Sequence, residues 1–209
     1  MKRCIRFLAS FIGSIVALLM AHYFNFIIFL TFVPDDKKYD VCIAVYFTCI
    51  EAIIGIIFDF ICEWFESRRT YIEVVFYNPK ETVNISATPI VKFNNMGMAE
   101  LMLRVKVKGK SANIKNGSIR IEAFKQADMQ FAKKGLGAKI SNNGDALIKL
   151  MDICDGHEEL DYEEDFKLVF QRGDYDTYSS RNIKPELVSV KSPYVKYERN
   201  YMEIILEER

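Results

Sequence analysis

Two long apolar runs open the chain, with a short charged turn between them. The first covers residues 7–33, and the second covers residues 41–65 with the sequence VCIAVYFTCIEAIIGIIFDFICEWF. About 20 apolar residues are enough for a helix to cross the roughly 30 Å hydrocarbon core of a bilayer. The pattern therefore predicts a hairpin of two transmembrane helices, with spans at 7–33 and 41–65, in a domain of residues 1–69.

The second span carries acids at positions that would lie in lipid. Glu51 and Asp59 are two helical turns apart, and Gly55 lies between them on the same face. A charged side chain in the hydrocarbon core costs several kcal/mol, so such residues usually face protein or water. Three small or polar residues extend this face, which we call the acid stripe: Ala44, Thr48 and Cys62. The acid stripe predicts further copies as partners, and hence a homo-oligomer.

The first span has a polar stripe of its own. Small and polar residues recur there every three or four positions, which favours close helix approach; they are Ser10, Ser14, Ala17, Ala21 and Asn25. A hairpin folded about residue 37 would place His22 level with Glu51, and Ser14 level with Asp59. The predicted intramembrane polar seam comprises Ser14, His22, Asn25, Thr48, Glu51 and Asp59. It either holds the hairpin and its oligomer together or lines a water-filled, ion-responsive path.

From residue 70 onward the apolar positions change to the period of two that is typical of strands. Residues 100–108 show it most clearly, because Leu101, Leu103, Val105 and Val107 alternate with longer polar or flexible side chains. Further strands are expected at 70–77, 83–87, 90–93, 119–124, 146–151, 166–171 and 201–206. We expect residues 70–209 to form an all-β domain, an immunoglobulin-like sandwich or a small barrel.

Composition and charge narrow the function. The 28 basic residues balance the 28 acidic ones, which gives no support for binding long nucleic acid. Four of the five cysteines lie in or beside the apolar runs, so the soluble part has no disulfide framework. This cysteine usage is typical of a reducing compartment.

The distribution of basic residues predicts the orientation. Lys2, Arg3 and Arg6 precede the first span, and Arg68 and Arg69 follow the second. Basic residues prefer the cytoplasmic side of a membrane. Both the N-terminus and the C-terminal domain are therefore expected in the cytoplasm.

One predicted strand carries a row of positive charge. Arg104, Lys106 and Lys108 share a strand face, Lys110 and Lys115 follow, and no acid lies between positions 101 and 121. This basic ribbon could bind an anionic ligand or membrane lipid, where each basic residue contributes about 1 kcal/mol. The alternative is the solvated face of an amphipathic strand.

Two other segments allow more than one interpretation. Residues 133–139, KKGLGAK, could cradle phosphate through backbone N–H groups, with Lys133 and Lys134 beside it, or form a plain loop. Residues 152–165 hold eight acids and His157 without Lys or Arg. We expect this acidic run to be a surface loop; docking on the basic ribbon of a neighbouring copy and metal binding are the alternatives.

Catalysis finds little support. The chain has two histidines and lacks the GxSxG, HExxH and CxxC patterns, so no nucleophile with an adjacent base is indicated. We expect no enzyme activity, no cofactor and no bound metal.

The order and size of the parts resemble a known class of protein. The FLASFIGSIVALLM and VCIAVYFTCIEAIIGIIFDF spans followed by a β-rich remainder resemble small membrane effectors of bacterial anti-phage defence. In those proteins a β-rich domain senses a cyclic oligonucleotide and the spans breach the inner membrane. The resemblance implies a ligand-responsive effector in the bacterial inner membrane. A membrane-anchored scaffold that grips a protein partner, or an auxiliary subunit of a transporter or channel, are the alternatives.

Overall fold

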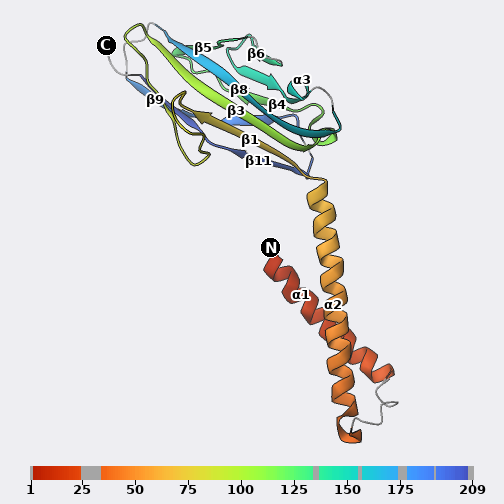
Figure 1. Ribbon diagram of the computed structural model, residues 1–209. Coiled ribbons are helices and arrows are strands. Elements are labelled where there is room, and N and C mark those ends of the chain that lie inside the picture. Colours follow the sequence, from red (N-terminus) through yellow and green to blue (C-terminus); the bar gives the residue numbers. More distant parts are fainter. Residues whose placement is uncertain are drawn as a thin grey trace. The chain divides into compact units, whose positions relative to one another are not determined.

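The computed structural model describes residues 2–24, 34–133, 137–154, 157–173, 178–190 and 192–206. The chain divides into two compact units, a helical unit of residues 1–66 and a β-domain of residues 67–209. Figure 1 shows the elements of each unit. Asn25, Lys134 and part of the acidic run lie outside the described residues.

The helical unit consists of helix α1 (Lys2–Tyr23), the 3-10 helix η2 (Asp35–Lys37) and helix α2 (Lys38–Ser67). The second predicted span lies within α2. The segment Asp35–Ser67 is the one described helix that is long and apolar enough to cross a membrane. Helix α1 ends at Tyr23, so the first predicted span of 7–33 is not helical at Phe24. Its apolar described part, Ser10–Tyr23, is shorter than a bilayer requires.

Small side chains bring α1 and α2 together. Ala17 and Ala21 are buried, and a Cβ on Gly13 would lie 3.5 Å from Ile50 and 3.6 Å from Ile54. The predicted close-approach stripe on the first helix is therefore confirmed for Ala17 and Ala21. Gly13 belongs to the same contact and was missed, although it is the smallest residue of the run.

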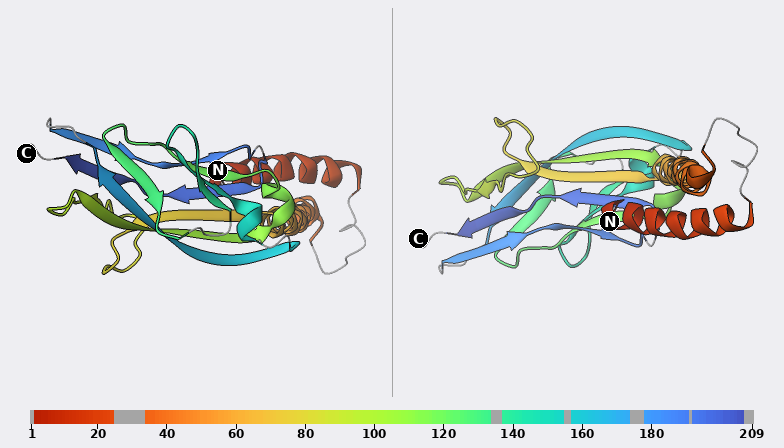
Figure 2. Two further views of the ribbon diagram at one scale, coloured as in Figure 1. Left: turned by 90° about the horizontal axis from the view of Figure 1, so that it is seen from above. Right: turned by 90° about the horizontal axis from the view of Figure 1, so that it is seen from below.

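The β-domain contains three sheets. The first has the order β11–β1–β3–β8–β5, and Figure 2 shows its long strands side by side; its members are β1 (Thr70–Tyr77), β3 (Met98–Lys110), β5 (Ala127–Phe131), β8 (Glu159–Arg172) and β11 (Val195–Arg199). The second has the order β10–β4–β7–β6, with β4 (Ser118–Ile121), β6 (Ala138–Ile140), β7 (Ala146–Lys149) and β10 (Pro185–Val188). The third has the order β2–β12–β9, with β2 (Ile90–Val91), β9 (Ser179–Ile183) and β12 (Met202–Leu206). Short helical turns η3 (Ser111–Ile114) and α3 (Leu150–Ile153) connect strands.

One hydrophobic core joins all three sheets. Leu103 and Leu168 from the first sheet, Ile119 and Ile148 from the second and Ile204 from the third are fully buried in the same cluster. Strands with one buried face alternate apolar and polar residues, and β3 shows this alternation from Ala99 to Lys108. The predicted all-β domain is confirmed as a β-sandwich, and its immunoglobulin-like topology stays a prediction.

Several strand predictions hold and one is wrong. Residues 70–77 form β1, and residues 100–108 lie within β3. Residues 83–87 form no strand. Instead, Asn84 accepts the backbone N–H of Ser86 through its side chain (2.9 Å) and that of Ala87 through its carbonyl (3.1 Å). This local turn, which an asparagine side chain favours, replaces the predicted ladder bonds.

The start of β1 is anchored tightly within the β-domain. The buried Thr70 hydroxyl accepts the Lys110 N–H (2.9 Å) and donates to the Lys110 carbonyl (2.8 Å). Asn113 Nδ2 donates to the Arg68 carbonyl (2.7 Å) and to Thr70 Oγ1 (2.9 Å). Gly109 has φ +131°, and a Cβ there would overlap the Arg69 carbonyl. The entry of the chain into the sandwich is therefore fixed by hydrogen bonds and by a glycine.

Candidate functional site

The acid stripe of α2 is exposed along its length. Glu51, Gly55 and Asp59 are all exposed, and a Cβ on Gly55 would meet nothing within 4 Å. The residues of α2 that pack on α1, among them Cys42 and Ile54, lie on a different face of the helix. One copy of the helical unit therefore leaves both carboxylates uncovered by the described residues.

Glu51 has one described partner, Ser10. Ser10 Oγ donates to Glu51 Oε1 over 3.2 Å. The predicted depth pairing, with His22 level with Glu51 and Ser14 level with Asp59, is wrong. Helix α1 ends at Tyr23 and α2 begins at Lys38, so the hairpin turns nearer residue 30 than residue 37. The facing residues shift accordingly.

The other described residues of the predicted seam do not form a network. Ser14 donates to the Ser10 carbonyl (2.9 Å), and Thr48 donates to the Ala44 carbonyl (2.8 Å), so both hydroxyls bond to their own helix. His22 is exposed and packs edge-on against Tyr23, with 5.1 Å between ring centroids. The predicted seam is therefore reduced to the Ser10–Glu51 contact, beside an open acid stripe.

The basic ribbon of β3 is matched by acids in the same chain. Strand β8 pairs antiparallel with β3 and places Asp165 opposite Arg104, Glu163 opposite Lys106, and Asp161 opposite Lys108. The four ion pairs are Arg104–Glu163 at 2.7 Å, Arg104–Asp165 at 2.8 Å, Lys106–Glu163 at 3.5 Å and Lys108–Asp161 at 3.4 Å. The expectation of a ribbon of uncompensated positive charge is wrong, because the strand pairing brings the acids alongside it.

The acidic run is correspondingly not a surface loop over most of its length. Residues 159–165 belong to β8, with Leu160 buried and Asp161 exposed. The alternative of docking on a basic ribbon was correct in chemistry, but the ribbon belongs to the same chain. Among the described residues no group of three or more His, Cys, Asp or Glu side chains could hold a metal ion.

Arg104 is the most constrained residue of this charged face. Its Nε and Nη2 donate to the two carboxylate oxygens of Asp165, each over 2.8 Å, and its guanidinium lies 5.5 Å from the centroid of the Tyr77 ring. The hydrogen bonds from Arg104 lower the pKa of Asp165. Burial is the main cause of the raised pKa of the Tyr77 hydroxyl. This bidentate geometry fixes Arg104 as part of the sheet and makes it a poor candidate for binding a ligand.

The remaining predicted ligand residues are dispersed. Lys110 is exposed at the end of β3, and Lys133 is exposed at the described edge of the KKGLGAK segment. Residues 138–140 of that segment form β6. The described structure therefore does not bring Lys133 together with the basic ribbon on one element.

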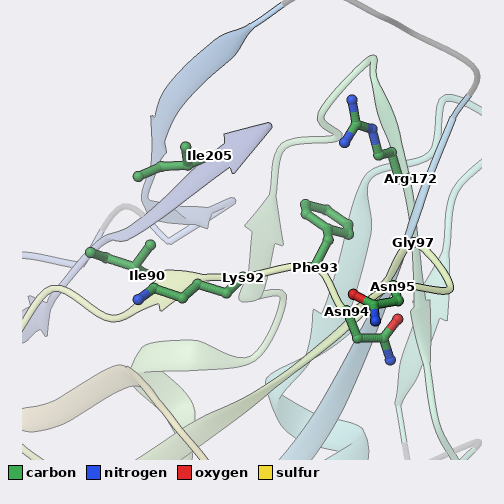
Figure 3. Close-up of a pocket in the computed structure, with 8 residues that line it drawn as sticks. All are labelled: Ile90, Lys92, Phe93, Asn94, Asn95, Gly97, Arg172 and Ile205. Carbon is green, nitrogen blue, oxygen red and sulfur yellow. The ribbon is translucent and has the colours of Figure 1, made fainter. Parts of the chain in front are cut away.

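A cavity of about 670 Å³ lies at the end of the sandwich where β3 begins and β8 ends. We call it the distal cavity, and Figure 3 shows the residues that line it: Ile90, Lys92, Phe93, Asn94, Asn95, Gly97, Arg172 and Ile205. Sequence reasoning recognised the Asn94–Gly97 turn but not the cavity. Lys92 and Arg172 are 80 positions apart in the sequence, and only the pairing of Met98 with Gln171 brings their strands together.

No known protein family model matches the chain, and no curated protein matches its sequence. Solved structures with some likeness include the third cohesin ScaC from Acetivibrio cellulolyticus, crystallised with the ScaB dockerin (13% identity, 65% of this chain and 96% of that chain, TM-score 0.33). CaCohA2 from Clostridium acetobutylicum has 8% identity, covering 66% of this chain and 91% of its own, with TM-score 0.35. The bacterial hydrophobin BslA has 13% identity, covering 67% and 98%, with TM-score 0.29. Likeness at this level carries no inference about function.

Proposed function

We propose that the chain is a non-enzymatic membrane effector that works as a homo-oligomer. Its helices lie in the bacterial inner membrane, and its β-domain receives a ligand in the cytoplasm. The observation that carries the proposal is the exposed acid stripe of α2, with two carboxylates and an open glycine on a helix long enough to span a bilayer.

The physical argument concerns desolvation. A plain anchor has no need of Glu51 and Asp59, since each charged residue in lipid costs several kcal/mol. Neighbouring copies that meet along the acid stripe would give the carboxylates protein or water as surroundings, and Gly55 would allow their backbones to come close. An oligomer with carboxylates at its centre is suited to passing water or ions.

The resemblance to anti-phage effectors makes a cyclic oligonucleotide or another anionic ligand the proposed trigger. The basic ribbon is not the proposed receptor, because Arg104, Lys106 and Lys108 are paired with acids of β8. A receptor elsewhere in the β-domain is required.

A second candidate, a membrane-anchored scaffold or accessory subunit, is favoured by the same charged sheet face. Its mixed and exposed ion pairs suit a protein partner better than a free anion, since complementary charges guide association. In that function the acid stripe would only be tolerated.

The two candidates differ in the effect of Glu51→Gln. Overproduction of the wild-type chain should permeabilise bacterial cells to a membrane-impermeant dye, since a high concentration drives assembly by mass action. Glu51→Gln keeps the shape and hydrogen bonding of the side chain and should reduce dye uptake about tenfold or more at equal membrane levels. Glu63→Gln makes the same change near the end of the apolar run and is the matched control, expected to retain wild-type uptake. Wild-type uptake in Glu51→Gln combined with Asp59→Asn would favour the scaffold.

A further inference from the structure

The distal cavity differs from the rest of the β-domain in its charge. Its described lining contains two cations, Lys92 and Arg172, and no carboxylate. A second cavity, beside β5 and β6, is lined by both Asp128 and Lys139, and the basic ribbon is matched by β8. The distal cavity is therefore the described site whose lining carries basic side chains without an acid.

The backbone around the distal cavity is held in place before any ligand arrives. Asn94 Oδ1 accepts the N–H groups of Met96 (2.9 Å) and Met98 (3.0 Å), and the Gly97 N–H donates to the Asn94 carbonyl (2.9 Å). The Arg172 N–H in turn donates to the Gly97 carbonyl (2.8 Å). Gly97 has φ +73°, which a glycine adopts without strain. The turn and the base of the arginine form one unit.

The side chains combine positive charge with an aromatic surface. In Figure 3 the Phe93 ring lies between the side chains of Lys92 and Arg172. Phe93 is partly buried against the main core, which fixes its ring. Asn95 is exposed at the rim and offers an amide for hydrogen bonding. A volume of about 670 Å³ is within the usual range of roughly 300–1,000 Å³ for small-molecule sites.

We infer that the distal cavity binds a small organic phosphate with an aromatic ring, namely a nucleoside phosphate. Arg172 and Lys92 would hold the phosphate, because guanidinium and ammonium groups donate strong hydrogen bonds to phosphate oxygens. Phe93 would contact the base through its ring. The role of this ligand as the trigger rests on the proposed function, whereas its binding is an independent property of the β-domain.

Isothermal titration calorimetry on the full-length chain in detergent tests the inference with two probes, adenosine 5′-monophosphate and inorganic phosphate. The wild type should bind the nucleotide more tightly than inorganic phosphate. The double variant Lys92→Gln/Arg172→Gln should lose at least about tenfold in nucleotide affinity, since charged hydrogen bonds to the phosphate are removed. Phe93→Leu should weaken nucleotide binding several-fold and leave phosphate binding unchanged.

The matched control is Lys106→Gln/Lys108→Gln, which removes the same charge from the paired ribbon. It should bind the nucleotide like the wild type, and circular dichroism should show that all variants are folded. Equal nucleotide affinity in the cavity variant and the wild type would overturn the inference, as would no binding by the wild type at millimolar nucleotide. A folded ribbon variant that loses binding would return the site to β3. None of these outcomes depends on dye uptake, so the proposed function and the cavity can fail separately.

Discussion

At the scale of single residues, Arg104 shows how a charged side chain can be structural. Its two hydrogen bonds to Asp165, its ion pair with Glu163 and its stacking on Tyr77 use the whole guanidinium within one sheet face. Exposed ion pairs contribute little to stability, typically below about 1 kcal/mol, but a bidentate pair beside an aromatic ring lies at the upper end of that range.

Arg104→Gln should therefore lower the free energy of unfolding by about 1 kcal/mol at neutral pH, measured by urea denaturation. The lowered pKa of Asp165 means that the unfolded state binds the proton more readily. The contribution of the pair is present above the ordinary pKa of an aspartate, near 3.9, and is lost as the pH falls through the folded pKa. The difference between wild type and variant should shrink towards pH 2. Lys108→Gln, which removes a looser pair, is the control and should change stability less. An unchanged stability difference from pH 7 to pH 2 would exclude this account of the pair.

At the scale of elements, residues 68–70 show how backbone proximity restricts the sequence. The Arg69 carbonyl lies against Gly109, which leaves no space for a side chain. Gly109→Ala should destabilise the β-domain by about 1–3 kcal/mol through overlap and an unfavourable φ. Thermal denaturation followed by circular dichroism would measure the loss. Gly144→Ala, with φ +84° and a nearest contact of 3.2 Å to Ala123 rather than backbone, is a control with the same φ penalty but less overlap and should cost less. Equal melting temperatures for wild type and Gly109→Ala would contradict the described contact.

The elements also show how far the sequence alone could lead. Strands β1 and β3 were predictable because buried Ile72 and Val74, and Leu101 and Leu103, follow a period of two. The first half of β8 was not, because its acids resemble a loop and their partners lie some 60 positions away in β3. Strands β9 and β11 mix exposed and partly buried positions and gave no clear period. The distal cavity depends on strand pairing, so no local pattern could reveal it.

At the scale of the whole molecule, the proposed function requires a defined orientation in the membrane. Basic residues at both flanks of the apolar region predict that the N-terminus and the β-domain are cytoplasmic. In a cysteine-free background, Asp36→Cys should react with an impermeant maleimide in intact cells. Ser179→Cys should react only after lysis. The reverse pattern would place the β-domain outside and exclude a cytosolic ligand.

The central claim is that copies of the chain meet along the acid stripe, and cross-linking at Gly55 tests it most directly. Gly55 is open in a single copy, so Gly55→Cys should tolerate the new side chain. In membranes with the native cysteines removed, an oxidant should link pairs of chains through this residue. Ile56→Cys is the matched control, because Ile56 is 70% exposed at nearly the same depth but lies about 100° around the helix. The account predicts several-fold more cross-linked dimer at position 55 than at position 56; equal yields at both positions, or none at position 55, would contradict it.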